Sequence, residues 1–217
     1  MGRPKLSVEK RREVEMQLIR ITNELIHREG LGAVTIRKIA QEAGLNSAIL
    51  YKYFADLDEL LMFACVDIFK AYPRELAQSE KRMELASPEK VYLITWELFC
   101  KHAFAYPECM HHLFFGKHSD QLGHVVADYY ELFPEQLAGM SDDLQVMIRT
   151  SKLRARNLEV LRPLLRGREP EARLNLINDL TVSFFHTLLL EKMSGGDAVD
   201  NGTQTARMLE ACRLLIA

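Results

Sequence analysis

The sequence predicts an all-α protein, in which a short N-terminal domain of three helices is joined by a long helix to a larger helical domain. Apolar residues recur at steps of three and four along most of the 217 residues, and glycine, proline and helix-capping residues separate these runs. No convincing segment alternates between apolar and polar residues, and no internal repeat is present. This length allows one large domain or two small ones, with a sizeable core.

The first expected element is a helix over residues 8–29. Its apolar residues follow steps of four, three and four, which places them on one face. The "GLG" at 30–32 ends this helix, because glycine favours the conformation that closes a helix C-terminus. The residues on the apolar face are Val14, Leu18, Ile21 and Leu25.

Two short helices should follow, separated by a glycine turn. Thr35 is placed to cap a helix that runs to about residue 43, since its hydroxyl can accept from a backbone N–H of the first turn. Asn46 or Ser47 then caps a third helix that continues through Phe54. This layout of helix, tight turn and helix over about 35–54 is that of a helix-turn-helix.

Longer helices fill the rest of the chain. Asp56 caps a long helix, "LDELLMFACVDIFKAY", which Pro73 interrupts or ends. Ser87 and Pro88 open the next helix as its cap and first residue. The remaining helices are expected from Pro107, over about 120–138, over 142–165, over 170–194, and after a cap at Thr203.

Charge is distributed unevenly along the chain. Residues 1–54 hold ten Lys and Arg against six Asp and Glu, whereas the remainder holds eighteen against twenty-four. A basic head on an acidic body favours contact with a polyanion at one end, although a merely solvated basic tail fits the charge equally well.

Membrane and secretory classes are disfavoured. No apolar run approaches the roughly 20 residues that span a bilayer, and the basic N-terminus lacks the apolar stretch of a signal peptide. The scattered cysteines, Cys65, Cys100, Cys109 and Cys212, are typical of buried free thiols in a reducing compartment. We therefore expect a cytoplasmic protein.

The third helix of the chain, the second of the two short ones, carries tyrosines although aromatic side chains are usually buried. Ile49 or Leu50 and Phe54 have the spacing to face the core, so Tyr51 and Lys52 face outward and Tyr53 lies near the edge. A phenol can donate to a phosphate oxygen, and an ammonium releases counterions from DNA. The small Ser47 and Ala48 would let the helix approach base edges. The alternative is a helical hairpin with tyrosines as amphipathic surface.

Residues 10–61 resemble the DNA-binding domain of the tetracycline-repressor (TetR) family of transcriptional regulators. The matching motifs are "REGLGAVTIRKIAQEAGL", then "ILYKYF", then an acidic cap before "ELL". The resemblance implies a repressor that binds a palindromic double-stranded DNA operator as a homodimer and is released by a small-molecule effector. It also implies the DNA-contacting residues, which are Thr35, Arg37, Lys38, Asn46, Ser47, Ala48, Tyr51, Lys52 and Tyr53, with Arg3 in a minor-groove arm, "GRPK". The alternative for "GRPK" is a disordered tail that makes no contact with DNA.

The chain departs from the family pattern at a few positions. Many relatives have Thr at Ile49, Gly at Ala48, and at Leu57 a lysine that anchors the following helix to a phosphate. Leu57 cannot make that contact, which leaves Lys52 or the basic arm to compensate.

We expect the DNA-binding domain to span residues 1–69 and the effector-binding and dimerisation domain to span residues 70–217. Broad apolar faces on the last two helices could pair with those of a second chain as a four-helix interface. A wholly intramolecular core is the competing explanation. The candidate interface residues are Leu174, Ile177, Thr181, Phe184, Leu188, Met208, Cys212 and Leu215.

Bulky side chains crowd residues 92–133, which suggests a pocket for a small apolar or aromatic effector. Plain core packing would give the same pattern. The candidate pocket residues are Trp96, Phe99, Cys100, Phe104, Met110, Phe114, Tyr129, Met147 and Phe184.

No enzyme, cofactor or metal site is expected. The "CMHH" at 109–112 fits no standard zinc spacing, and no phosphate loop, GxSxG or HExxH motif occurs. The alternative for the larger domain is a module that docks a protein partner instead of a small ligand, which a closed core and an exposed apolar patch would favour.

Overall fold

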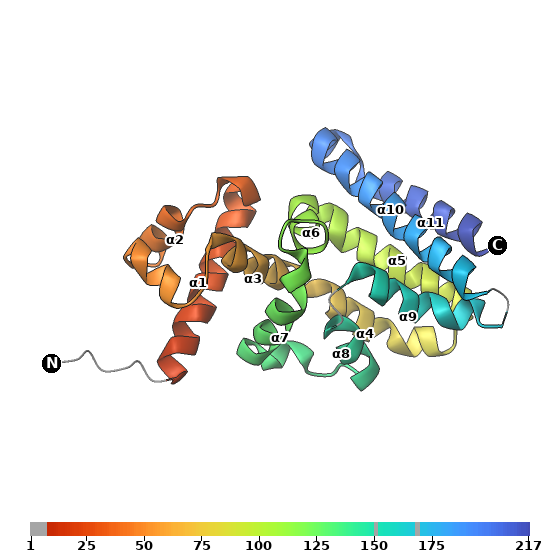
Figure 1. The fold of residues 1–217 in the computed structure, drawn as a ribbon, viewed down its shortest axis with the longest axis horizontal. Coiled ribbons are helices and arrows are strands. Elements are labelled where there is room, and N and C mark those ends of the chain that lie inside the picture. Colours follow the sequence, from red (N-terminus) through yellow and green to blue (C-terminus); the bar gives the residue numbers. More distant parts are fainter. Residues whose placement is uncertain (1–7, 150–151, 168–169) are drawn as a thin grey trace.

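The computed structural model describes residues 8–149, 152–167 and 170–217, and every regular element within these ranges is helical. The predicted all-α fold class is thereby confirmed. Figure 1 shows a smaller lobe containing α1 and α2 at one end, from which α3 leads into a larger lobe formed by the later helices. The elements are α1 (Val8–Glu29), η1 (Leu31–Ala33), α2 (Ile36–Glu42), η2 (Ser47–Lys52), α3 (Leu57–Phe69), α4 (Ala71–Glu84), α5 (Pro88–Ala105), α6 (Pro107–Phe114), η3 (Ser119–Gln121), α7 (Leu122–Leu132), η4 (Pro134–Leu137), α8 (Asp142–Arg149), α9 (Leu153–Leu165), α10 (Glu171–Gly195), η5 (Gly196–Ala198) and α11 (Asn201–Ile216).

The predicted caps of the small lobe are present. Thr35 Oγ1 accepts from the backbone N–H of Lys38 at 3.3 Å, and Asn46 Oδ1 accepts from that of Ala48 at 2.9 Å. Gly44 turns the chain between them with a φ of 65°, a conformation that side chains with a Cβ disfavour. These caps fix the start of each of the two helices in the predicted helix-turn-helix.

The second of the two predicted short helices is a 3₁₀-helix, η2. Its backbone hydrogen bonds join residues three apart, such as Ile49 N–H to Asn46 O at 2.8 Å. Residues three apart lie above one another in this geometry, so Ala48 and Tyr51 share one face, which is exposed. Leu50 and Phe54 are buried beneath it.

The long helix predicted after Asp56 is two helices. Asp56 does cap α3, accepting from the Glu59 N–H at 2.8 Å, but α3 ends at Phe69. Pro73 lies in the first turn of α4, where a helix loses nothing by lacking an N–H. The helix over 71–84 was not anticipated as a separate element.

Three other boundaries differ from the sequence prediction. The single helix expected over 142–165 is divided into α8 and α9, with Lys152 extended just before α9. The helix expected over 120–138 ends at Leu132, since the residue before Pro134 disfavours helical geometry. Asp200, not Thr203, caps α11, and it accepts from the Thr203 N–H at 2.7 Å.

Helix α3 connects the two lobes through its packing. It lies against α1 on one side and against α6 and α7 on the other, and all of its residues from Leu60 to Asp67 are buried. In the larger lobe α5 packs against α4, α9 and α11, around the aromatic core. The domain boundary at 69/70 stays a prediction, because α3 contributes to both lobes. Within the described ranges, no helix is long and apolar enough to cross a membrane.

Candidate functional site

The outer surface of η2 is the first candidate site. Tyr51 is 59% exposed, and Lys52 and Ala48 beside it are also exposed, whereas Leu50 beneath them is 3% exposed. Thr35, Arg37 and Asn46 are exposed on the preceding turn and α2. We call this set of exposed residues on 35–37 and 46–52 the recognition face. A tyrosine held outward by a buried leucine is placed to reach a phosphate.

Tyr53 and Ser47 are half-buried at the border of the recognition face. The Arg11 guanidinium lies 5.7 Å from the centroid of the Tyr53 ring, and Arg11 also pairs with Glu15 at 2.8 Å. This cation–π contact connects α1 to η2. Tyr53 is therefore partly engaged inside the small lobe.

Lys38 has a different environment from its neighbour Arg37. The Lys38 Nζ donates to Glu29 Oε2 at 2.6 Å and to the Ala33 carbonyl at 2.8 Å. Hydrogen bonds from Lys38 and then Arg28 lower the pKa of the Glu29 carboxyl. Arg37 and Lys52 form no ion pair within the part of the chain that the structure describes. Arg37 and Lys52 are thus better placed for DNA than Lys38, and Arg3 lies outside the described residues.

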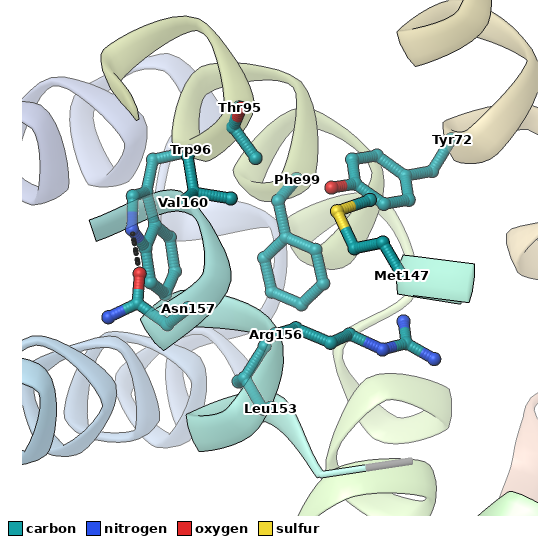
Figure 2. Close-up of a pocket in the computed structure, with 9 residues that line it drawn as sticks. All are labelled: Tyr72, Thr95, Trp96, Phe99, Met147, Leu153, Arg156, Asn157 and Val160. Carbon is teal, nitrogen blue, oxygen red and sulfur yellow. Dashed lines mark hydrogen bonds between the residues drawn. The ribbon is translucent and has the colours of Figure 1, made fainter. Parts of the chain in front are cut away.

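The second candidate site is a pair of cavities in the larger lobe. The first has a volume of about 30 Å³, and Figure 2 shows its lining, which comes from α4, α5, α8 and α9. It contains the predicted pocket residues Trp96, Phe99 and Met147. Its full lining is Tyr72, Thr95, Trp96, Phe99, Met147, Leu153, Arg156, Asn157 and Val160.

The second cavity also has a volume of about 30 Å³, and Tyr72 and Arg156 line both. It reaches α3 through Val66 and Phe69, and it includes Phe114 from the predicted set. Of the other predicted pocket residues, Phe184 is half-buried on α10, and four are buried in the core without lining either cavity. These four are Cys100, Phe104, Met110 and Tyr129.

Hydrogen bonds order the polar side of the first cavity. Trp96 Nε1 donates to Asn157 Oδ1 at 2.9 Å, drawn as a dashed line in Figure 2, and Asn157 Nδ2 donates to Asn178 Oδ1 on α10 at 2.8 Å. The Arg156 guanidinium donates to the Ile148 carbonyl at 2.5 Å and lies 5.4 Å from the Phe114 ring centroid.

Sequence reasoning missed Tyr72, Arg156 and Asn157. The spacing of Leu153, Asn157 and Leu161 in steps of four, all buried, places Asn157 on the inner face of α9 and could have revealed it. The sequence prediction joins 142–165 into one helix, and this hides the separate phase of α9.

The predicted dimer residues mostly lie inside one chain. Leu174, Ile177, Thr181, Leu188, Met208 and Cys212 are buried in the isolated chain, and Phe184 and Leu215 are half-buried. The six buried side chains are therefore already covered and are not available to a second chain. The apolar residues left outside are Leu176 (57% exposed), Leu180 (47%) and Leu190 (42%) on α10 and Leu214 on α11.

Two histidines of the larger lobe lie close together. His111 on α6 faces His186 on α10 with ring centroids 5.4 Å apart, and His186 stacks on Phe115 at 3.9 Å. Within the described ranges, no three side chains of His, Cys, Asp or Glu are placed to hold a metal ion.

Comparison with known proteins agrees with this geometry. Residues 18–62 match the model for bacterial regulatory proteins of the tetR family. The HTH-type transcriptional regulator HbdR of Aromatoleum sp. (strain CIB) is 34% identical over 73 residues, which are 34% of this chain. The chain matches 30% of that relative's length.

Solved structures resemble the chain over nearly its whole length. RolR, solved with its ligand resorcinol, has a TM-score of 0.59 at 19% identity, with 96% of each chain covered. A TetR regulator from Rhodococcus sp. RHA1 has a TM-score of 0.55 at 14% identity, covering 96% of this chain and 97% of the other. FadR of Thermus thermophilus, in complex with lauroyl-CoA, has a TM-score of 0.57 at 14% identity, covering 93% and 92%.

The fold and the recognition face define an all-α helix-turn-helix protein of two lobes. Residues 18–62 match the TetR family of bacterial regulatory proteins, and the whole chain has a fold like that of the solved regulators above.

Proposed function

We propose that the protein is a cytoplasmic transcriptional repressor without catalytic activity, which binds a palindromic operator as a homodimer and releases it when a small apolar or aromatic effector binds the larger lobe. The observation that carries this proposal is the recognition face, with Tyr51 and Lys52 outside and Leu50 and Phe54 beneath. A phenol and an ammonium on a short capped helix match the groups that bind phosphates along a groove.

The cavities give the proposed effector a route to the DNA-binding lobe. The second cavity borders Val66 and Phe69 of α3, and α3 packs against α1. Two recognition segments that read one palindrome should lie roughly 34–36 Å apart. A ligand releases DNA only if it favours another separation, and enlarging a cavity against α3 would do so. The ligand-bound relatives RolR and FadR support an effector.

The experiment for the function is a selection of bound fragments from random duplex DNA with the purified full chain. We expect enrichment of a two-fold symmetric sequence, whose affinity then falls in the presence of one member of a small-molecule panel. Failure to retain any duplex at low salt would contradict DNA binding, and an affinity indifferent to every compound would contradict the switch.

Alanine at Arg37 or Lys52 should weaken operator binding for all sequences and should reduce the slope of log affinity against log salt by about one unit each. Tyr51→Phe should cost about 1–3 kcal/mol of binding without changing sequence preference, since a phosphate contact positions the protein but reads no base. Fluorescence anisotropy across a salt series measures both effects. Lys81→Ala, which removes an exposed lysine from α4, is the control. Wild-type affinity for all three changes would mean that another face binds DNA.

We propose that a second copy of the chain covers the outer face of α10. Leu176, Leu180 and Phe184 follow one another at steps of four, and a two-fold operator requires a two-fold protein. Leu180→Glu should destabilise the dimer by about 3 kcal/mol or more, because two buried carboxylates would meet near the axis. Sedimentation should show a monomer with weak operator affinity.

The matched control for the interface is Leu85→Glu, which adds the same charge at a leucine that is 92% exposed after α4. This variant should remain dimeric. A Leu180→Glu protein with unchanged mass would contradict the interface, and a wild-type monomer would favour a protein partner on this face.

A further inference from the structure

Arg156 is the charged residue shared by the two cavities. It projects from α9, and with Tyr72 it lines both spaces, as Figure 2 shows for the first. The remaining lining of both cavities, taken from the residues that the structure describes, is apolar, aromatic or uncharged polar and contains no carboxylate. Among the described lining residues, Arg156 is therefore the charged side chain that a ligand in either cavity would meet.

The Arg156 side chain is half-buried. The Arg156 side chain donates to the Ile148 carbonyl and lies over the Phe114 ring, and burial lowers the pKa of the guanidinium. Arginine stays protonated even so, and it offers five N–H donors in a planar fork. An anion that entered would offset the desolvation of the cation and gain charge-assisted hydrogen bonds.

The rest of the first cavity suits an apolar ring. The rings of Trp96 and Phe99 meet edge to face at a centroid distance of 5.6 Å, and Met147, Leu153 and Val160 complete the wall. Thr95 and Asn157 supply the uncharged polar groups, and Asn157 is already held by Trp96 and Asn178. Such a lining recognises hydrophobic area and leaves Arg156 to recognise charge.

We propose that the effector is a small aromatic or alicyclic carboxylate, whose carboxylate binds Arg156 while its ring packs against Trp96 and Phe99. This inference rests on the proposed function, since it names the chemical class of that effector. A cavity of about 30 Å³ holds water but not a ring. Tyr72 and Arg156 line both cavities, and we call these two side chains the partition. Binding must therefore displace the partition and join the two cavities.

Joining the cavities would make the ligand bind the opened arrangement of the larger lobe more tightly than the closed one. The second cavity is bordered by Val66 and Phe69, so a ring that opens the partition presses on α3. The closed arrangement described by this structure and the opened arrangement then differ in the position of α3, which is what a release of DNA requires.

The test uses the chain's single tryptophan, Trp96, as a reporter in the first cavity. Benzoate, phenylacetate and cyclohexanecarboxylate are titrated against the full chain, each beside its neutral amide, with fluorescence as the readout. At least one acid should bind about tenfold or more tightly than its amide. Arg156→Gln should reduce that preference to within about twofold, and Arg156→Lys should keep part of it.

Arg154→Gln is the matched control. It removes the same charge two residues away, where the guanidinium is half-exposed and pairs with Asp179 on the surface at 2.6 Å. This variant should keep the full preference for acids. Thermal melting confirms that each variant is folded, and if Arg156→Gln does not fold, the acid–amide comparison in the wild type and in Arg156→Lys still decides.

Three outcomes would overturn the proposal. These are amides that bind as tightly as acids, an acid preference that survives Arg156→Gln, and a Trp96 signal that no acid changes. A neutral compound that releases operator DNA equally from wild type and Arg156→Gln would overturn this inference and leave the proposed function intact. Acid binding at Trp96 without any effect on operator affinity would overturn the switch and leave the ligand class intact.

Discussion

Replacing Asp67 with alanine should lower the free energy of unfolding by about 3–5 kcal/mol, because it removes the acceptor from a buried, charged hydrogen-bond network. The Asp67 carboxylate is 3% exposed. It accepts from the Tyr129 hydroxyl at 2.7 Å and from Lys70 Nζ at 3.0 Å, and it also accepts from Asn23 Nδ2. Without it, a buried phenol and a part-buried amide lose their partner.

The position of Asp67 makes this loss more than local. Asn23 lies on α1, Asp67 on α3 and Tyr129 on α7, so one carboxylate bonds the small lobe to the larger lobe. We therefore expect Asp67→Ala to weaken operator binding as well, even where the protein remains folded. Asp67→Asn keeps an acceptor oxygen for the Tyr129 hydroxyl but not the charge for Lys70, and it should lose less stability.

Urea unfolding at neutral pH measures the change, with operator affinity as the second readout. Asp58→Ala is the control, since Asp58 lies on the same helix with a half-exposed carboxylate that lies 3.4 Å from His118 Nε2. Its loss should cost less than about 1 kcal/mol. An Asp67→Ala protein within about 1 kcal/mol of wild type would show that the network contributes little.

Local signals predicted the small lobe well. Thr35, Asn46 and Asp56 cap helices through hydrogen bonds within three residues, so the sequence alone determines them. The break at Lys70 was missed for a different reason. Residues from Leu60 to Val66 are buried on every side of α3, and Phe69 and Tyr72 continue the apolar run beyond its end. A helix buried all round has no apolar phase that would reveal a change of axis.

The candidate sites also differ in whether local sequence or tertiary packing determines them. The outward position of Tyr51 follows from the spacing of its own short helix, and the structure shows that side chain exposed. On α10, Leu174 and Ile177 are buried while Leu176 and Leu180 are exposed, yet all four are apolar. Which face is covered depends on where α9 and α11 pack, and periodicity does not contain that information. Arg156 was missed similarly, because only tertiary packing turns that guanidinium inward.

Raising the pH from about 9 to about 10.5 should progressively destabilise the protein, because buried thiols and phenols must stay protonated in the folded state. Burial raises the pKa of the Cys65 and Cys100 thiols, and it raises the pKa of Cys212 to about 12. It likewise raises the pKa of the phenols, which are Tyr72, Tyr92, Tyr129 and Tyr130.

The sign follows from the direction of these shifts. A pKa that is higher in the folded than in the unfolded state gives stability that is complete below the unfolded value, about 8.5 for a thiol and about 10 for a phenol. That stability is lost as the pH rises toward the folded value, by about 1.4 kcal/mol per pH unit for each group. Three thiols thus remove about 6 kcal/mol between pH 9 and pH 10.5, which is comparable with the whole stability of a typical domain.

Urea unfolding between pH 7 and pH 11, under reducing conditions, measures this loss. Tyr92→Phe removes one buried phenol, whose hydroxyl lies 3.4 Å from the Thr181 hydroxyl, and it should make the decline above pH 10 shallower by about 1.4 kcal/mol per pH unit. Tyr51→Phe removes an exposed phenol and should leave the profile unchanged. A stability that stayed constant from pH 8 to pH 11 would mean that water reaches these groups in the folded protein, and that the core around α3, α5 and α11 is less closed than the structure describes.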